Sequence, residues 1–255
     1  MGERLRGRVA VISGGATGVG GAASRLFAAE GARVAVLDVN VEAAQATAQA
    51  VRDGGGEAMV APADVSVAAE VDAAVASVLQ RWGRIDVLFN HAGSIVVKPF
   101  LDTTEAEWDR LMAVNVKSMY LVTRAVLPTM LAQGKGAIVC TSSISAVAGT
   151  PMEVLYDTTK GACHMFARAI AVEYRDRGIR CNAVCPGFVR TPHGLREVDA
   201  LRRLGVDLSD AALAVAQGRI CEPEEVAAAA LFLASDEASF VNGTHLFVDN
   251  GFTAA

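Results

Sequence analysis

Short runs of β-branched and apolar residues alternate along the chain with Ala-rich stretches whose apolar positions recur every three or four residues. The runs are typical of buried strands, and the three- and four-residue spacing is typical of amphipathic helices. The pattern predicts seven strands, at 8–13, 33–38, 57–64, 84–93, 136–143, 179–187 and 244–251. It predicts helices at 18–31, 41–56, 67–83, 104–132, 155–177 and 223–235. Only the stretch between Pro186 and Cys221 is weakly patterned.

Apolar strands that alternate with helices indicate a seven-stranded parallel sheet covered by helices on both faces. Right-handed crossovers then produce a doubly wound, Rossmann-type α/β fold. No linker or internal repeat interrupts the alternation, so we expect residues 1–255 to form a single domain.

Composition narrows the choice of partners. The chain has 255 residues, 52% of them hydrophobic, and a net charge of −5. This balance argues against a nucleic-acid surface or an anionic membrane as partner. The N-terminal "MGERLR" is charged where a signal peptide would be apolar, and the longest apolar runs are too short to span a bilayer. We therefore expect a cytoplasmic protein.

The cysteine pattern gives no sign of a metal or redox site. Five cysteines are an odd number, and none forms a CxxC pair. Buried small hydrophobic residues are the better interpretation, and we expect no bound metal.

A glycine-rich turn, "SGGATGVGG", follows the first predicted strand. Gly14, Gly18 and Gly20 would permit a tight turn and close approach of the backbone to a pyrophosphate at a helix N-terminus. Asp38 ends the second strand, eighteen residues after Gly20, where a carboxylate can accept hydrogen bonds from a ribose. It would repel a 2′-phosphate, and Val39 beside it supplies no cation. The pattern favours NAD over NADP; a plain turn and a solvated aspartate are the alternatives.

The stretch "YDTTK" places Tyr156 four residues before Lys160. On a helix these positions share a face, so both side chains can reach one cavity. An ammonium group near a phenol stabilises the phenolate and lowers its pKa. The pair could therefore act as a proton donor and acceptor, although such a pair alone arises easily by chance.

At this point the whole chain resembles the classical short-chain dehydrogenase/reductase family. The resemblance rests on the glycine turn, Asp64 and Val65, the "NHAG" turn at 90–93, Asn115, Ser143, the Tyr156–Lys160 pair and "PGFVRT" at 186–191. It implies catalytic roles for Asn115, Ser143, Tyr156 and Lys160. It implies cofactor contacts for Gly14, Thr17, Gly18, Val19, Gly20, Asp38, Val39, Asp64, Val65, Asn90, Ala92, Gly93, Tyr156, Lys160, Pro186, Gly187, Val189 and Thr191.

The same resemblance implies a mechanism. Tyr156 would exchange a proton with the substrate oxygen, and Lys160 would lower the pKa of Tyr156 and hold the nicotinamide ribose. Ser143 would orient the substrate oxygen, and Asn115 would hold a water that links Lys160 to solvent. Ser142 is one residue too far from Tyr156, and we expect it to pack within a strand.

Two positions depart from the family pattern. His91 stands where the family has a second asparagine, and we interpret it as a structural turn residue. Asn250 stands where the family has a glycine, and we expect the turn to survive because asparagine tolerates a positive φ.

The segment 191–217 matches the family's substrate lid. Leu195, Val198, Leu201 and Leu204 could form its apolar face, with Arg196, Glu197, Arg202 and Arg203 outside. That face either closes over the substrate or only packs onto the sheet edge. The candidate substrate contacts are Ser94, Ile95, Ser143, Ser145, Met152, Glu153 and His193. This mixture suggests a small or medium secondary alcohol with a second polar group.

The sequence thus predicts an NAD-dependent alcohol dehydrogenase or reductase, with one dinucleotide-binding and catalytic domain and a homotetrameric assembly. Met119, Leu121, Met165 and Phe166 are apolar positions beyond those that one sheet face needs, which favours an oligomer. An NADPH-dependent 3-oxoacyl-carrier-protein reductase and a non-catalytic NAD-binding regulator remain as alternatives. Which alcohol or ketone is the substrate stays open.

Overall fold

The computed structural model describes residues 2–254, and its centre is a seven-stranded sheet of strand order β3-β2-β1-β4-β5-β6-β7. The strands are β1 (Val9–Ser13), β2 (Arg33–Asp38), β3 (Glu57–Pro62), β4 (Val87–Asn90), β5 (Gly136–Thr141), β6 (Ile179–Pro186) and β7 (His245–Val248). Every neighbouring pair is parallel. The predicted doubly wound fold is therefore confirmed.

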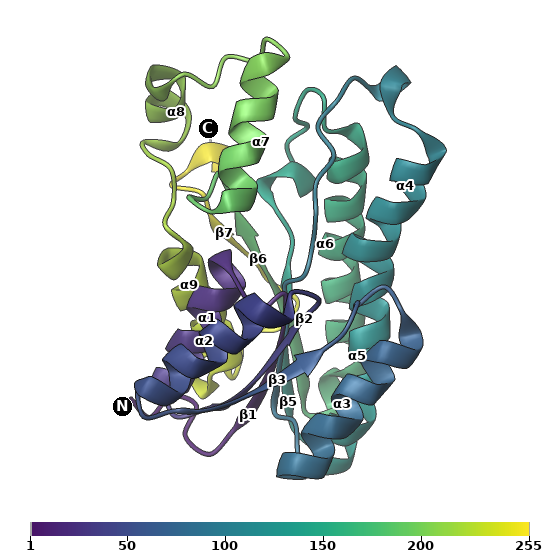
Figure 1. Ribbon diagram of the computed structural model, residues 1–255, viewed down its shortest axis with the longest axis vertical. Coiled ribbons are helices and arrows are strands. Elements are labelled where there is room, and N and C mark those ends of the chain that lie inside the picture. Colours follow the sequence, from purple (N-terminus) through teal and green to yellow (C-terminus); the bar gives the residue numbers. More distant parts are fainter. Residues whose placement is uncertain (1, 255) are drawn as a thin grey trace.

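Helices cover both faces of the sheet (Figure 1). On one face lie α1 (Gly18–Ala29), α2 (Val41–Asp53) and α9 (Pro223–Ala234). On the other lie α3 (Ala68–Trp82), α4 (Glu105–Met112), α5 (Ser118–Gln133) and α6 (Val154–Tyr174). The pair α7 (Pro192–Arg203) and α8 (Asp210–Gln217) lies beyond the carboxyl ends of the strands, at the top of the view.

Two hydrophobic clusters follow from the alternation of side chains along each strand. Ala10 and Ile12 of β1 pack with Phe27 of α1 on one face. Val9 and Val11 pack with Val122 of α5 on the other. Because successive side chains of a strand point to opposite faces, a strand that is buried on both sides must be apolar throughout.

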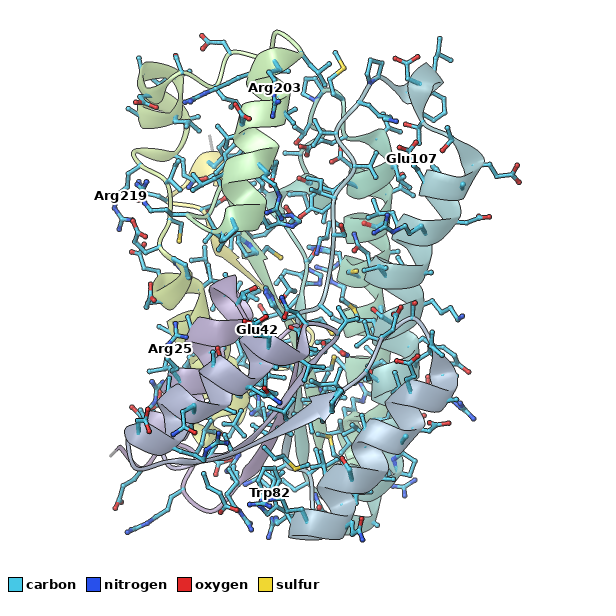
Figure 2. The ribbon with its side chains drawn as sticks, viewed as in Figure 1. Arg25, Glu42, Trp82, Glu107, Arg203 and Arg219 are labelled. Carbon is cyan, nitrogen blue, oxygen red and sulfur yellow. The ribbon has the colours of Figure 1, made fainter. Side chains whose placement is uncertain are left out.

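Local sequence signals set several helix ends. Thr104 and Glu107 form a reciprocal cap at the start of α4, with Thr104 N donating to Glu107 Oε2 over 2.9 Å. Glu107, which is labelled on α4 in Figure 2, also pairs with Lys98 at 2.7 Å. Proline occupies the first turn of both α7 and α9, where its missing N–H costs no hydrogen bond.

The predicted helix over 104–132 is broken by a change of helical type. Between α4 and α5, residues Ala113–Lys117 form a π-helix. Such a bulge widens one turn and is frequent at functional sites. Asn115, one of the predicted catalytic residues, lies in it.

The weakly patterned stretch 186–221 contains α7 and α8. Near the C-terminus, Asn250 adopts φ 50°, and its Nδ2 donates to Gln217 O over 3.0 Å. The left-handed turn expected at Asn250 is confirmed. Across residues 2–254, none of the helices combines the length and the apolarity needed to cross a bilayer.

Arg180 of β6 anchors the C-terminal end of α9. Its guanidinium donates to Leu233 O over 2.8 Å and to Ser235 O over 2.9 Å. The Leu233 carbonyl, in the last turn of α9, has no following helical turn to donate to it, so the guanidinium supplies that hydrogen bond. Ser235 O also accepts from Ala238 N over 3.3 Å, so the guanidinium is its second donor.

We expect Arg180→Ala to lower the free energy of unfolding by about 2 kcal/mol, because two partly buried carbonyl groups lose a charged donor. Urea unfolding followed by circular dichroism measures the change. Arg177→Ala, at an exposed position, is the matched control. Equal stability of the two variants would contradict the anchoring role.

Candidate active site

The glycine turn lies between β1 and α1. Gly14 and Gly18 adopt φ values of +67° and +52°, which side chains disfavour. A methyl group on Gly20 would collide with the Gly14 carbonyl oxygen. Thr17, the N-cap of α1, makes no side-chain hydrogen bond to the helix. The first amides of α1 are therefore left without a side-chain acceptor, an arrangement that suits a phosphate group.

Asp38 lies beside this turn. Its Oδ2 accepts from Ala16 N over 3.1 Å and its Oδ1 from Asn40 N over 2.9 Å. The carboxylate thus joins the end of β2 to the glycine turn as well as presenting negative charge there. Val39, the next residue, is 72% exposed.

The turns after β3 and β4 complete this side of the site. Asp64 Oδ1 accepts from both the amide and the hydroxyl of Ser66, which lowers the pKa of Asp64, and Val65 is buried. Asn90 directs its amide under the sheet edge to Thr123 Oγ1, over 2.9 Å. The side chain of Asn90 is therefore used internally, so any cofactor contact falls to its backbone.

The backbone of the "NHAG" turn is held by Ser13. The amides of His91 and Ala92 donate to Ser13 Oγ over 3.0 and 3.2 Å. The His91 ring stacks on Phe89 and contacts Thr141 Oγ1 at 3.0 Å. Burial, reinforced by the charge of Lys160, lowers the pKa of His91 to about 3, so the ring is neutral. These contacts agree with a structural role for His91.

The segment after β6 packs against the glycine turn. A Cβ on Gly18 would lie 3.2 Å from Thr191 Cγ2, and Thr191 Oγ1 accepts from Gly194 N to cap α7. The buried amide of Gln217 bonds both the N–H and the C=O of Phe188 at 2.9 Å. Gln217 thereby clamps the stretch that contains Pro186, Gly187 and Val189. Sequence reasoning missed this clamp, since a lone glutamine has no periodic signal.

Tyr156 and Lys160 lie one turn apart on α6, and both are buried. Lys160 Nζ donates to Thr141 O over 3.1 Å and lies 5.5 Å from the centroid of the Tyr156 ring. The i, i+4 spacing thus brings both side chains to the end of β5, as the helical geometry predicts.

The two serines at the end of β5 have different partners. Ser142 Oγ donates to Lys160 O over 3.1 Å, which fixes α6 to the strand. Ser143 Oγ contacts Ser145 Oγ at 3.2 Å and also interacts with the Tyr156 phenol. The structure therefore brings Ser143, and not Ser142, to the phenol.

Asn115 is held within the π-helical turn by a full set of side-chain bonds. Its Oδ1 accepts from Ser94 N, and its Nδ2 donates to Ser94 O and Thr159 Oγ1, all within 2.8 to 2.9 Å. A Cβ on Gly93 would lie 3.3 Å from Asn115 Oδ1 and 3.8 Å from Lys160 Nζ. Asn115, Gly93 and Lys160 therefore converge at one point below Tyr156.

Comparison with known proteins places this geometry in a family. The family model described as enoyl-(acyl carrier protein) reductase matches residues 14–253. Cyclopentanol dehydrogenase from Comamonas sp. (strain NCIMB 9872) is 40% identical over 251 residues, which cover 98% of this chain and 99% of that protein. The crystal structure of levodione reductase superposes with a TM-score of 0.94 at 35% identity, covering 99% and 100% of the two chains.

A gluconate 5-dehydrogenase from Burkholderia cenocepacia J2315, in complex with NADP and tartrate, superposes with a TM-score of 0.90. It is 35% identical and covers 99% of this chain and 97% of its own. The chain belongs to the classical short-chain dehydrogenase/reductase family. This family binds a nicotinamide cofactor, and the relatives named here are dehydrogenases and reductases.

The electrostatics at Tyr156, the tyrosine predicted to be catalytic, are dominated by burial. Burial raises the pKa of Tyr156 well above its usual value, and the carboxylates of Glu197 and Glu153 raise it further, while Ser143 opposes them. Burial also lowers the pKa of Lys160. We expected Lys160 to lower the pKa of Tyr156; in this structure desolvation and two acidic neighbours dominate, and the pKa of Tyr156 is raised.

Glu153 is the N-cap residue of α6, three residues before Tyr156, and is only 1% exposed. Neither carboxyl oxygen has a hydrogen-bond partner. Burial, and then the charges of Glu197 and Asp157, raise the pKa of Glu153 to about 9. Met152 before it holds a strained φ of 67°, and its carbonyl oxygen accepts from Lys98 N over 2.8 Å. The carboxyl is thus held in place by backbone and packing, without a polar partner of its own.

The lid helix α7 presents a different face to the site from the one predicted. Val198 and Leu201 are buried, at 4% and 0% exposure, but Leu195 and Leu204 are 45% and 38% exposed. Glu197, predicted to lie outside, is partly buried and acts on Tyr156. A helical period anchored on the pair Val198 and Leu201 would have placed Glu197 on the inner side, four residues before Leu201.

The remaining predicted substrate contacts also lie around Tyr156. Ile95 packs in one cluster with Tyr156, and Met152 packs with the buried lid residues. Ser145 is buried beside Ser143. His193 is neutral, because burial and then Lys160 and Arg196 lower its pKa to about 4.

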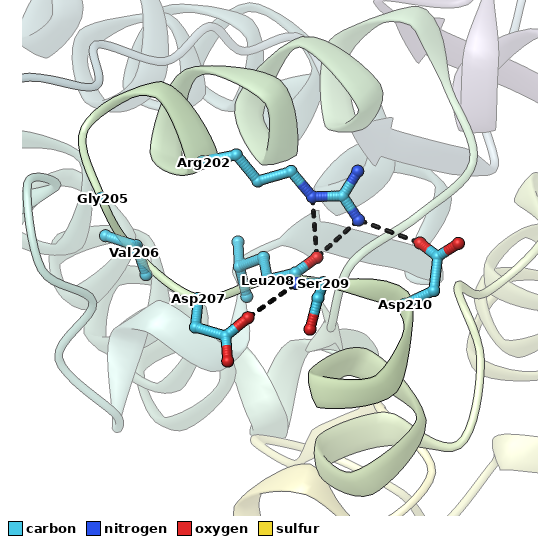
Figure 3. Close-up of a pocket in the computed structure, with 7 residues that line it drawn as sticks. All are labelled: Arg202, Gly205, Val206, Asp207, Leu208, Ser209 and Asp210. Carbon is cyan, nitrogen blue, oxygen red and sulfur yellow. Dashed lines mark hydrogen bonds and ion pairs between the residues drawn. The ribbon is translucent and has the colours of Figure 1, made fainter.

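The connection between α7 and α8 is braced outside the catalytic cluster (Figure 3). Arg202 reaches from α7 to Leu208 O over 2.8 Å and to Asp210 Oδ1 over 3.0 Å. These residues help to line a hollow of about 500 Å³ that none of the predicted catalytic residues lines. We interpret this hollow as part of the lid's support.

Glu153 makes stability depend on pH. Between its usual pKa of 4.5 and its folded value of about 9, the folded protein keeps a proton that the unfolded chain releases. The free energy of unfolding contributed here therefore falls as the pH rises through this window. Glu153→Gln removes the titration, so its melting temperature should exceed that of the wild type by a margin that grows toward alkaline pH.

Differential scanning fluorimetry across this pH window measures that margin. Glu224→Gln, which removes an exposed carboxylate on α9, is the control and should show no growing margin. A constant difference between Glu153→Gln and the wild type would show that Glu153 does not hold the extra proton.

Proposed function

We propose that this protein is an NAD-dependent oxidoreductase that interconverts a secondary alcohol and a ketone. The observation that carries the proposal is the convergence of Ser143, Tyr156 and Lys160 at the end of β5, with Asn115 behind Lys160. The glycine turn lies at the same carboxyl edge of the sheet, where doubly wound folds bind their ligands.

The residues present fit a nicotinamide dinucleotide. Gly20 leaves no room for a side chain next to Gly14, and the first turn of α1 offers free amides for a pyrophosphate. Asp38 supplies an acidic group at the position suited to ribose hydroxyls. When bound, such a cofactor supplies the acceptor or donor of the hydride.

The chain's own residues transfer the proton and orient the substrate oxygen. The Ser143 hydroxyl hydrogen-bonds the oxygen and orients the alcohol. Tyr156 takes the hydroxyl proton during oxidation and returns it during reduction. Lys160, fixed by Thr141 O, opposes the cost of a buried phenolate. Asn115 positions the turn behind Lys160 through its bonds to Ser94 and Thr159.

An NADPH-dependent reductase of the 3-oxoacyl-carrier-protein type is the second candidate. The matching family description names an acyl-carrier-protein reductase, and one similar structure contains NADP. Asp38 disfavours this candidate, because its carboxylate would face the 2′-phosphate. A non-catalytic NAD-binding regulator has no need of the complete set of four catalytic-type residues.

We infer that residues 191–217 serve as the substrate lid of a single dinucleotide-binding and catalytic domain. Their helices cover the carboxyl edge of the sheet, and Val198 and Leu201 pack with Phe188 and Met152 beneath them. This packing supports a lid whose leucines are partly structural, with Glu197 facing the site.

We still propose a homotetramer, but different side chains from those first considered support it. Met119 and Leu121 are buried in the protein's own core and Phe166 packs against it, so they do not favour association. The exposed large apolar side chains of α5 and α6 are Tyr120, Val154, Met165 and Val172, at 52%, 46%, 58% and 65% exposure. These side chains support a contact between subunits on this face.

Tyr156→Phe should lower kcat for alcohol oxidation by roughly a thousandfold, because the only phenol in the site is the proton acceptor. Affinity for NADH should change little, since the ring is preserved. Steady-state kinetics and fluorescence titration measure the two quantities. Tyr120→Phe, at an exposed position, is the control. Substantial turnover by Tyr156→Phe would refute the role of the phenol.

Asp38 should set the preference for NAD. We expect wild-type kcat/KM to favour NAD over NADP, and Asp38→Asn to reduce that ratio by roughly tenfold, through the loss of one repulsive charge. Glu42→Gln, which removes the exposed carboxylate in the first turn of α2, is the matched control (Figure 2). A wild-type preference for NADP would overturn the cofactor assignment and favour the reductase alternative.

A further inference from the structure

Glu153 is a buried carboxyl group that neither the fold nor the proposed chemistry uses. Its side chain is 1% exposed, both of its oxygens lack a hydrogen-bond partner, and it lies one helical turn before Tyr156. A buried carboxyl without a partner is costly, and native proteins retain few of them. Its retention beside the reacting position therefore points to a partner that arrives with the substrate.

Glu197 approaches the same position from the lid. It lies on α7, is partly buried, and acts electrostatically on both Glu153 and Tyr156. Burial raises the pKa of Glu197 to about 7, so this carboxyl shares the low-polarity surroundings of Glu153. We call Glu153 and Glu197 the acidic pair.

The positive groups nearest the acidic pair are already engaged or turned outward. Lys160 donates to Thr141 O, and Lys98 pairs with Glu107. Arg196 is exposed, and His193 is uncharged at neutral pH. Asp157, on α6, adds a third carboxyl, whose Oδ1 is buried and has no partner while Oδ2 accepts from Thr150 N over 2.9 Å. The substrate side of Tyr156 is thus lined by acids from two elements.

We infer that the acidic pair binds a positively charged amino group of the substrate. The substrate class is then a secondary amino alcohol and its amino ketone; this inference rests on the proposed alcohol oxidation. Side chains one helical turn apart have their Cβ atoms about 5 to 6 Å from each other, so the amine lies only a few bonds from the carbinol carbon.

A cation between the two carboxyls also affects the catalytic tyrosine. Glu153 and Glu197 both raise the pKa of Tyr156, so an ammonium group that neutralises them lowers that pKa and favours the phenolate. An amino alcohol would therefore assist the ionisation of the base that oxidises it. A neutral alcohol would bind beside the same base without this assistance.

Matched substrates of different charge test the inference. One set is 1-aminopropan-2-ol, propane-1,2-diol and lactate; a larger set is 2-amino-1-phenylethanol, 1-phenylethane-1,2-diol and mandelate. We expect wild-type kcat/KM at neutral pH to be at least roughly tenfold higher for the amino alcohol than for the diol of at least one set, and lowest for the acid.

The variants Glu153→Gln and Glu197→Gln should each reduce the ratio of kcat/KM for amino alcohol over diol by roughly tenfold. Because the ratio is taken within one variant, a general loss of activity cancels. The wild-type ratio should rise with pH between about 6 and 9, as Glu197 and then Glu153 ionise, and this rise should be smaller in the variants. Glu224→Gln is the control, and melting temperatures show that each variant is folded.

The outcomes separate the inference from the function on which it rests. Oxidation of the diols without preference for the amino alcohols, or a preference unchanged in both folded Gln variants, would overturn the acidic pair and leave the alcohol dehydrogenase intact. A lack of turnover of all six compounds with either nicotinamide cofactor would overturn both proposals.

Discussion

Desolvation of ionisable groups at the carboxyl edge of the sheet is the constraint on which this site depends. Tyr156, Lys160 and Glu153 are all buried, and burial is the first cause of the pKa change in all three. Burial disfavours the charged form of each group, so none of them is held in its charged state by water. Their protonation therefore responds to whatever charge is placed among them.

The desolvated site follows from the ordinary geometry of parallel strands and helices. Parallel strands bring the ends of β1, β4, β5 and β6 to one edge, and α6 then lays Tyr156 and Lys160 across the end of β5. Asn115 lies in the π-helical turn between α4 and α5, at this edge of the sheet. Its side-chain amide donates to Ser94 O and to Thr159 Oγ1. Removal of that turn would shift every residue of α5 relative to the sheet, so the bulge couples helix geometry to the site.

The proposed lid contributes α7 to the candidate site. Val198 and Leu201 fix α7 on its hydrophobic neighbours, and this packing directs Glu197 inward toward Glu153. One helix thus carries both the apolar side chains that hold α7 in place and the acidic side chain that we propose for substrate recognition. The proposed cofactor site, by contrast, is built largely from glycines and backbone groups. These groups fix where a ligand can lie but add no charged side chain.

Much of the fold and of the catalytic set could be predicted from the sequence, because the signals involved are local. Strand runs, helical periods, the glycine spacing and the interval from Tyr156 to Lys160 each lie within one element or one turn. The positive φ of Asn250 and the packing role of Ser142 also follow from residue type and spacing. These features require no knowledge of distant neighbours.

Tertiary structure alone decided the features that depend on which elements meet. Nothing in the sequence distinguishes Glu197 from an exposed glutamate. Only the packing of α7 through its apolar side chains brings Glu197 close enough to act on Tyr156. The raised pKa of Tyr156 and the missing partners of Glu153 likewise arise from burial among residues far apart in the chain. The sequence by itself determined the sheet, the glycine turn after β1 and the placement of Tyr156 and Lys160 on one face of α6. The charge around that pair was decided in three dimensions, because desolvation depends on every element that covers a side chain.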